Sequence, residues 1–166
     1  MSKEFTVLDI MTRNAICVRD AMQLLDAYHV LARHRFAGVP VVDSNERLVG
    51  ILTEYDVIAK ESLVHLPTLQ AISAHMRVYK KDMGNWEGEV MKLRALRVRD
   101  VMNTDPLMLP ITATFSEAVY AFQQHHRVNP IPIIDTQRRV VGVISRFDVL
   151  KPLMVIKKPK RVIKKK

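Results

Sequence analysis

Short runs of β-branched residues alternate along this chain with stretches in which apolar residues recur every three or four positions. The runs fall into two pairs: Val39 to Val42 with Leu48 to Leu52, and Ile131 to Ile134 with Val140 to Ile144. A five-residue polar segment separates the members of each pair, at positions 43–47 and 135–139. Strand-sized apolar runs joined by a short polar turn predict a β-hairpin.

A helix is predicted before each hairpin. In the first case the apolar residues at helical spacing are Ala21, Leu24, Leu25, Tyr28, Leu31 and Ala32. Their spacing places them on one helix face. In the second case Thr114 and Glu117 form a capping-box pattern ahead of Ala118, Val119 and Phe122. A further helix is expected after each hairpin, beginning near Thr53 and near Ser145.

Each of these sets begins with two shorter elements. A helical turn is expected to end at Met11 or Met102, followed by a short strand around Ala15 to Val18 or Leu107 to Leu109. The element order is therefore β-α-β-β-α, and it occurs twice. The sequence predicts an α+β fold, close to α/β in character.

An internal repeat explains the recurrence. The segment VGILTEYDVI at 49–58 matches VGVISRFDVL at 141–150, an offset of 92. Upstream, Asp9-Ile-Met11 matches Asp100-Val-Met102 at an offset of 91. The repeat divides the chain into a first copy (1–60), an insertion with a helical pattern (61–97), a second copy (98–153) and a basic tail (154–166).

Composition narrows the class of protein. Apolar residues make up 48% of the chain and charged residues 26%, and no apolar run approaches the length of a membrane span. The N-terminus lacks the apolar stretch of a secretory signal, so we expect a soluble cytoplasmic protein. The single cysteine, Cys17, lies between apolar neighbours and is interpreted as a buried strand thiol.

The net charge of +9 comes mostly from the tail. Seven Lys or Arg residues and no acidic residue lie between Lys157 and Lys166, which leaves 19 basic and 17 acidic residues in the remainder. A solvated extension is the commoner interpretation of such a tail, and binding to nucleic acid or an anionic membrane surface is the alternative. The tail is short and contains no aromatic residue, which disfavours specific RNA or DNA recognition.

The most informative motif is glycine, two apolar residues, a hydroxyl residue and, three positions later, aspartate. It is present as Gly50, Thr53 and Asp56, and again as Gly142, Ser145 and Asp148. The glycine allows a ligand or a neighbouring backbone to approach the strand, the hydroxyl lies at a strand-to-helix junction suited to phosphate, and the carboxylate could accept hydrogen bonds from a ribose. Alternatively, Thr53 and Ser145 simply cap the last helices.

With its P-V-V-D strand, hairpin and D-h-M start, the repeat resembles the cystathionine β-synthase (CBS) domain family. The resemblance covers about Val7 to Lys60 and Val98 to Pro152. It implies a paired arrangement, the Bateman module, with sheets packed about a pseudo-twofold axis, two clefts, and often a homodimer. It also implies an adenosyl ligand: AMP, ADP, ATP, NAD or S-adenosylmethionine.

The resemblance also implies roles for individual residues. Asp56 and Asp148 would bind ribose hydroxyls, and Thr53 and Ser145 would contact the phosphate. The expected neighbours of the base are Asn14 and Ile16, Thr104 and Pro106 at the start of each first strand, and Val39 and Ile131 before the strand prolines.

Two departures from the family pattern bear on the ligand. Relatives often carry His or Arg before the second strand, where this chain has Ala37-Gly38 and Asn129-Pro130, so a modestly charged ligand such as AMP is favoured over ATP. Arg35, Arg127 or Arg146 could compensate. In addition, Glu54 follows Thr53 whereas Arg146 follows Ser145, which predicts that the second site binds better than the first.

No catalytic motif or metal-ligand spacing is present, so we expect neither an enzyme nor a metal site. The adjacent His125 and His126 point in different directions on a helix and are expected to cap or pack. The leading hypothesis is a regulatory module that senses an adenosyl ligand and acts on a partner protein or through its own dimerisation. The alternative is a structural dimerisation module with empty clefts.

Overall fold

The computed structural model describes residues 5–59, 91 and 94–154. Within them it is a mixed α and β structure with two separate sheets, as predicted. The chain divides into two compact units. We call Ile16–Pro106 the continuous unit, and Met1–Ala15 together with Leu107–Lys166 the split unit.

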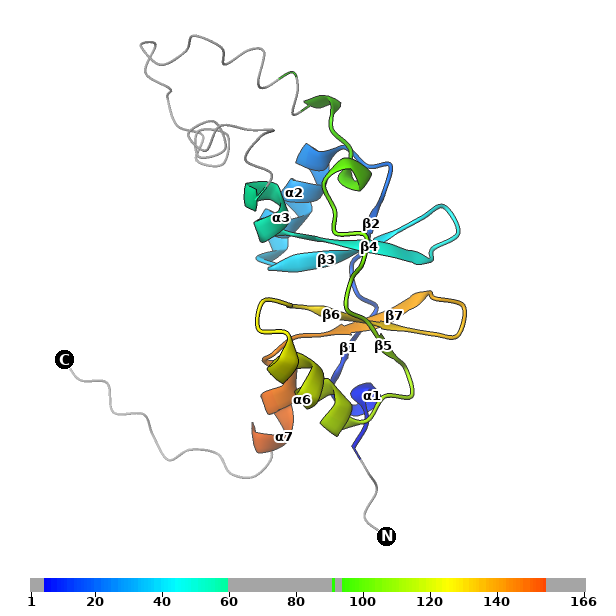
Figure 1. The fold of residues 1–166 in the computed structure, drawn as a ribbon, viewed down its shortest axis with the longest axis vertical. Helices are drawn as coiled ribbons and strands as arrows, with labels where there is room; N and C mark the ends of the chain where they lie inside the picture. Colours follow the sequence, from blue (N-terminus) through cyan, green and yellow to red (C-terminus); the bar gives the residue numbers. More distant parts are fainter. Residues whose placement is uncertain (1–4, 60–90, 92–93, 155–166) are drawn as a thin grey trace, which may run out of the picture. The chain divides into compact units, whose positions relative to one another are not determined.

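The continuous unit contains a three-stranded sheet in the order β2-β3-β4. Its strands are β2 (Val18–Arg19), β3 (Gly38–Val42) and β4 (Leu48–Thr53), and its helices are α2 (Leu24–His34), α3 (Glu54–Ala59) and the 3-10 helix η2 (Val98–Asp100). Strand β2 is parallel to β3, and β3 is antiparallel to β4. Helices α2 and α3 lie on the same face of this sheet (Figure 1).

The split unit contains a four-stranded sheet in the order β1-β7-β6-β5. Its strands are β1 (Thr12–Arg13), β5 (Leu109–Pro110), β6 (Ile131–Ile134) and β7 (Val140–Ile144), and its helices are α1 (Val7–Ile10), α6 (Phe115–Gln124), the 3-10 helix η3 (Asp148–Leu150) and α7 (Lys151–Met154). Helices α6 and α7 lie on one face of the sheet (Figure 1).

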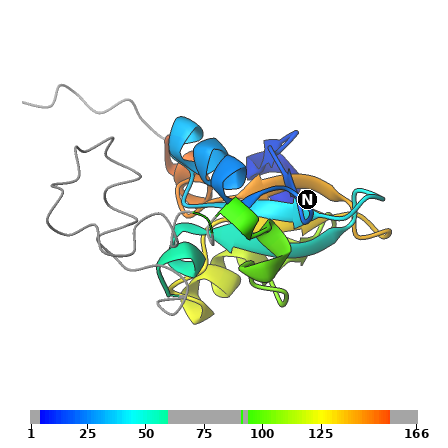
Figure 2. The same cartoon turned by 90° about the horizontal axis from the view of Figure 1, so that it is seen from above.

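Both predicted hairpins are present, and their turns have the same construction. Each turn begins with an aspartate whose side chain accepts two hydrogen bonds from backbone N–H groups. Asp43 accepts from Asn45 and Arg47, and Asp135 accepts from Gln137 and Arg139. Glu46 and Arg138 have positive φ angles of 63° and 61° at equivalent positions. In two orthogonal views each turn extends beyond the helices of its own unit (Figures 1 and 2).

The helices predicted before the hairpins and near Thr53 are present, whereas the one expected to begin near Ser145 is replaced by the 3-10 turn η3, from Asp148, and the short helix α7, from Lys151. The capping box of α6 is confirmed, because Thr114 N–H donates to Glu117 Oε2 at 2.7 Å and Glu117 N–H donates to Thr114 Oγ1 at 3.2 Å. In α2 the buried residues are Leu24, Ala27 and Leu31, whereas Ala21 and Ala32 of the predicted face are exposed. The buried face is therefore narrower than the apolar pattern, and Ala21 lies before α2, which begins at Leu24.

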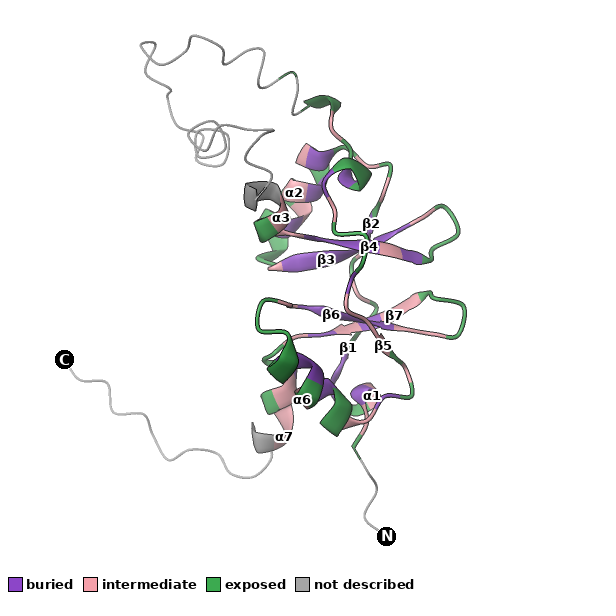
Figure 3. Cartoon of the chain, viewed as in Figure 1, coloured by how far each residue is buried: buried purple, intermediate pink, exposed green. Residues whose placement is uncertain are grey.

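Each unit has its own hydrophobic core. One core joins α1, α6, β6 and β7 through residues such as Ile10, Phe122 and Ile131, and the other joins α2, β3, β4 and η2 through residues such as Leu31, Leu52 and Val98. Buried residues occupy the strands and one side of the helices, while the hairpin turns are exposed (Figure 3). No described helix is long and apolar enough to cross a membrane.

The repeats exchange their first elements, which the sequence did not indicate. Helix α1 and strand β1 precede the first hairpin in sequence, yet they belong to the split unit, where β1 pairs with β7. Conversely, η2 precedes the second hairpin but belongs to the continuous unit, where Asn103 pairs with Ile51. Each compact unit therefore combines residues from both copies of the repeat.

The remaining sequence predictions are confirmed only in part. The short strands predicted at 15–18 and 107–109 are present as β2 and β5, but each begins at the last residue of its predicted range and ends one residue beyond it. Strand β1 was not predicted. The helices expected within 61–97 and the basic tail fall almost wholly outside the described residues.

Candidate functional site

In the first copy the motif forms a closed cap at the junction of β4 and α3. Asp56 Oδ2 accepts hydrogen bonds from the Thr53 backbone N–H at 2.8 Å and from Thr53 Oγ1 at 2.6 Å. Asp56 N–H donates back to Thr53 Oγ1 at 3.3 Å. The three-residue spacing brings these groups together because it equals about one helical turn.

The second copy repeats this arrangement at the junction of β7 and η3. Asp148 Oδ2 accepts from the Ser145 N–H and from Ser145 Oγ, both at 2.7 Å, and Asp148 N–H donates to Ser145 Oγ at 3.3 Å. Asp148 is 6% exposed and is the one polar or charged residue among the described residues classed as buried. The capping role considered for Thr53 and Ser145 is therefore real in both copies.

The cap limits what each motif can offer to a ligand. Both hydroxyls donate to their own aspartate, and the neighbouring backbone donors are also occupied: Glu54 N–H donates to the Ala37 carbonyl, and Arg146 N–H to Asn129 Oδ1. These donors would have to leave their partners to bind a phosphate. What the motif offers without rearrangement is acceptor capacity on the second carboxylate oxygen, Oδ1, which suits hydroxyl groups.

The two copies differ at that second oxygen. Lys151 Nζ lies 2.6 Å from Asp148 Oδ1 and also donates to the Ile10 carbonyl at 2.7 Å. For Asp56 Oδ1, no partner is found among the residues that the structure describes. Sequence reasoning missed Lys151, although its spacing of three residues from Asp148 suits an ion pair on a helix.

The strand glycines are explained by backbone approach rather than by a ligand. A Cβ added to Gly50 would lie 2.7 Å from the Asn103 carbonyl oxygen, and one added to Gly142 would lie 2.8 Å from the Thr12 carbonyl oxygen. Met102 Sδ and Met11 Sδ are each 2.8 Å from the corresponding added atom. Both glycines therefore admit the exchanged segment to its sheet.

The residues expected around the base divide between the two units. Thr53, Asp56, Ile16, Val39, Thr104 and Pro106 belong to the continuous unit, whereas Ser145, Asp148, Arg146, Asn14 and Ile131 belong to the split unit. Val39 and Ile131 are 1% and 0% exposed and belong to the two cores. Asn14, Ile16 and Thr104 are exposed, and Pro106 is buried. Their roles toward a base stay predictions.

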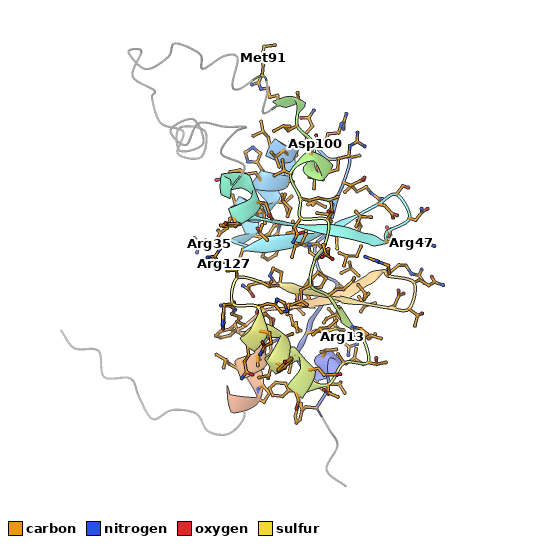
Figure 4. The ribbon with its side chains drawn as sticks, in the orientation of Figure 1. Arg13, Arg35, Arg47, Met91, Asp100 and Arg127 are labelled. Atoms are coloured by element: carbon orange, nitrogen blue, oxygen red, sulfur yellow. The ribbon has the colours of Figure 1, made fainter. Side chains whose placement is uncertain are left out.

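The arginines proposed as substitutes for the missing cations occupy helix ends. Arg35 caps α2 with a left-handed φ of 54°, and Arg127 follows α6; both are exposed (Figure 4). Arg146 donates from its guanidinium to the His125 carbonyl at 3.3 Å, at the C-terminus of α6. That interaction suits a cation at a helix C-terminus and holds Arg146 against α6.

Two open grooves lie on the split unit. One, of about 490 Å³, is lined by β5 and α6 residues including Leu109, Tyr120 and His125. The other, of about 330 Å³, is lined by Val119, Phe122, Gln123, His126, Arg146, Val149 and Leu150. Neither lining includes Ser145 or Asp148.

The cysteine and the histidines that the structure describes do not form a catalytic or metal-binding arrangement. Cys17 is half-buried and lies directly before β2, so the prediction of a buried thiol within a strand is wrong in part. Burial, with a smaller contribution from Glu46, raises the pKa of the Cys17 thiol to about 11, so it is a poor nucleophile at neutral pH. His34 ends α2 and stacks on Phe36. Within the described ranges, no three His, Cys, Asp or Glu side chains gather as metal ligands would.

Two sheet-and-helix units that carry the same capped Ser/Thr–Asp motif define a tandem-repeat module. A family model described as CBS domain matches residues 7–62 and 98–155. The chain therefore belongs to the CBS domain family, with two copies of the domain.

Three relatives illustrate the match. CBSX2 from Arabidopsis thaliana, a chloroplastic CBS domain-containing protein, is 24% identical over 93% of this chain and 66% of its own length. The chain thus spans just under two thirds of that relative. The crystal structure of CBSX2 with AMP has a TM-score of 0.68 and covers 93% of this chain and 99% of that one.

The other two are a solved domain pair and a longer enzyme. The CBS domain pair of protein MJ0100, in complex with 5-methylthioadenosine and S-adenosylmethionine, is 18% identical with a TM-score of 0.63, covering 93% of this chain and 99% of that one. Inosine-5'-monophosphate dehydrogenase from Bacillus subtilis is 25% identical over 78% of this chain but only 20% of its own length.

Proposed function

We propose that this chain is a regulatory module that binds an adenosyl compound through the ribose hydroxyls, with Asp56 and Asp148 as the acceptors. The observation that carries the proposal is the repeated cap, in which each aspartate is oriented through Oδ2. A carboxylate held in this way presents its other oxygen in a defined direction, which suits vicinal hydroxyls. Two copies of the arrangement imply up to two ligand sites.

The relatives support the class of ligand. The crystal structures of CBSX2 and of the MJ0100 domain pair contain AMP in one case and 5-methylthioadenosine with S-adenosylmethionine in the other. These compounds share adenosine and differ in the charge of the 5′ group. Recognition of the shared ribose and base would accommodate all of them.

The charges near the motif favour a modestly charged ligand. The backbone and hydroxyl donors expected to meet phosphate are occupied within the caps, and Arg146 is held at the C-terminus of α6. A triphosphate would need several new cationic partners. We therefore rank AMP and S-adenosylmethionine above ADP, NAD and ATP.

Isothermal titration calorimetry with AMP, ADP, ATP, NAD and S-adenosylmethionine tests the proposal. We expect AMP or S-adenosylmethionine to bind, and the Asp56→Asn/Asp148→Asn double variant to bind neither. Asp26→Asn on the exposed face of α2 is the matched control and should leave binding unchanged. Absence of binding by all five ligands at millimolar concentration would contradict the proposal.

Regulation follows if ligand binding favours one arrangement of the module over another. The readout would act on a partner protein or through dimerisation rather than through catalysis by this chain. We keep the cytoplasm as the proposed location, although CBSX2 is named as chloroplastic. For the basic tail, a solvated extension stays the first prediction, and contact with nucleic acid or an anionic membrane stays the alternative.

A structural dimerisation module is the second candidate, and exposed apolar side chains favour it. Phe147 is 61% exposed and Leu150 is 47% exposed, beside the 330 Å³ groove of the split unit. A second copy of the chain would cover these side chains. Light scattering should then report a dimer in the absence of ligand, and Leu150→Glu should shift it toward the monomer.

A further inference from the structure

The ion pair between Lys151 and Asp148 makes the two copies of the motif unequal. Lys151 Nζ contacts Asp148 Oδ1 at 2.6 Å and the carbonyl oxygen of Ile10 at 2.7 Å. The lysine thus joins α7 to the last residue of α1, within the split unit. At the equivalent position, an offset of 92, the first copy has Ala59, which carries no amine.

Acceptor capacity shows why the difference matters for a ribose. A carboxylate has about four acceptor positions, two on each oxygen. Toward the residues that the structure describes, Asp56 uses two of them, both on Oδ2, for the N–H and hydroxyl of Thr53. Asp148 uses the same two for Ser145 and a third, on Oδ1, for Lys151. Two vicinal hydroxyls can therefore both bond to Asp56, whereas one of them competes with the lysine at Asp148.

Burial strengthens the competition at the second copy. The Asp148 side chain is only 9% exposed, which leaves a ligand little surface by which to reach Oδ1, and Lys151 Nζ already contacts that oxygen at 2.6 Å. Charge also favours the lysine, because its ammonium is attracted by the Asp148 carboxylate and by the partial negative charge at the C-terminus of α1, at Ile10. To bind at Asp148 Oδ1, a neutral ribose hydroxyl must displace the Lys151 ammonium from a charge-assisted hydrogen bond.

We infer that Lys151 is a built-in competitor for the ribose site at Asp148, so that the Asp56 site binds an adenosyl ligand first and more tightly. This inference rests on the proposed function and reverses the ranking predicted from Glu54 and Arg146. Lys151 sets the difference between the sites and thereby the ligand concentration at which the second site fills.

The test measures each site alone by calorimetry, with AMP and S-adenosylmethionine as separate probes. In Asp56→Asn only the Asp148 site remains, and in Asp148→Asn only the Asp56 site. Adding Lys151→Ala to Asp56→Asn should raise affinity roughly two- to tenfold, the range for one net hydrogen bond. Adding Ala59→Lys to Asp148→Asn should lower affinity by a similar factor.

A comparison of two ligands distinguishes competition by Lys151 from a purely structural role of this lysine. AMP and 2′-deoxy-AMP differ by one hydroxyl, so the deoxy compound should lose more affinity at the Asp56 site than at the Asp148 site, and Lys151→Ala should make the two losses similar. Melting curves of all variants check that they fold. Should Lys151→Ala prevent folding, the Ala59→Lys variant still decides the question.

The outcomes are distinct. If no wild-type site binds either probe, the proposed function and this inference both fail. If the probes bind but Lys151→Ala leaves the Asp148 site unchanged or weakens it, the lysine is not a competitor, and the inference alone is overturned. Equal affinities at the two wild-type sites would overturn it as well.

Discussion

Single glycines decide whether a segment from the other copy can reach each sheet. An added Cβ would lie 2.7 Å from a backbone carbonyl oxygen at Gly50 and 2.8 Å from one at Gly142, with a methionine sulfur at 2.8 Å in both cases. A backbone atom that takes part in sheet pairing cannot move aside in the way that the end of a flexible side chain can. The glycine of the motif is thus a structural requirement, and its presence says little about a ligand.

Replacement of Gly142 by alanine should destabilise the protein by about 1 to 3 kcal/mol, the usual cost of overpacking. Gly50→Ala should have a similar effect, because its contact with the Asn103 carbonyl is equally close. Urea unfolding measures both variants. Thr136→Ala, at an exposed turn position, is the control and should be nearly neutral; a neutral Gly142→Ala would contradict the close approach.

Cys17 illustrates how burial controls reactivity at one residue. Its thiol pKa rises from 9.0 to about 11, so at pH 8 the native protein should hold about a hundredfold less thiolate than an unperturbed thiol. Alkylation by iodoacetamide, followed by mass spectrometry, should be slower in the native state by at least that factor than in urea. Equal rates would show that the thiol is exposed.

At the scale of elements, caps set where the helices begin. Thr114 with Glu117, Thr53 with Asp56, and Ser145 with Asp148 all place a carboxylate on the N–H of a hydroxyl residue three positions earlier. Thr6 and Asp9 do the same at α1. The motif that resembles a ligand site is therefore also one member of a general capping pattern in this chain.

The cap of α6 should make stability depend on pH. The Thr114 N–H and hydroxyl hold the pKa of Glu117 below its ordinary value of 4.5. Because the folded pKa is lower than the unfolded one, the cap stabilises the protein above about pH 4.5, and this contribution is lost as pH falls through the folded pKa. Unfolding curves should show Glu117→Gln less stable than wild type at pH 7, by a difference that shrinks as the pH falls below 4.5; a constant difference would contradict this.

At the scale of the whole molecule, the exchange of first elements makes each compact unit depend on both copies. The split unit takes α1 and β1 from the start of the chain, with Val7 and Ile10 at 0% and 1% exposure in its core. The Val7 N–H also donates to the Ala113 carbonyl at 3.0 Å. Neither copy contains all the elements of one unit.

Deletion of residues 1–13 should therefore destabilise the sheet that is encoded more than 100 residues later. Hydrogen–deuterium exchange should become faster in β7, which loses its pairing with β1, and in β6, which loses core contacts with α1. Strands β3 and β4 should change less. Deletion of residues 1–4 is the control, and exchange that rises equally in both sheets in the longer deletion would contradict the assignment of α1 and β1.

The sequence by itself was enough for the local elements. Periodicity and turn residues predicted the two hairpins, the helices before and after them and the cap at Thr114, because these depend on contacts between near neighbours. The repeat at an offset of 92 also sufficed for the tandem CBS architecture. The paired Ser/Thr–Asp motifs could also be found from the sequence, because the repeat places them at equivalent positions.

Tertiary structure alone decided how these parts are used. The pairing of β1 with β7, the approach of Asn103 to Gly50 and the contact of Lys151 with the Ile10 carbonyl each join residues about 50 to 140 positions apart. No local pattern encodes such contacts, because their free energy arises only once the sheets and cores have formed. The repeated motif could therefore be recognised in the sequence, and the spacing of Lys151 from Asp148 could have suggested their ion pair, but the contact of the lysine with the Ile10 carbonyl emerged only from the fold.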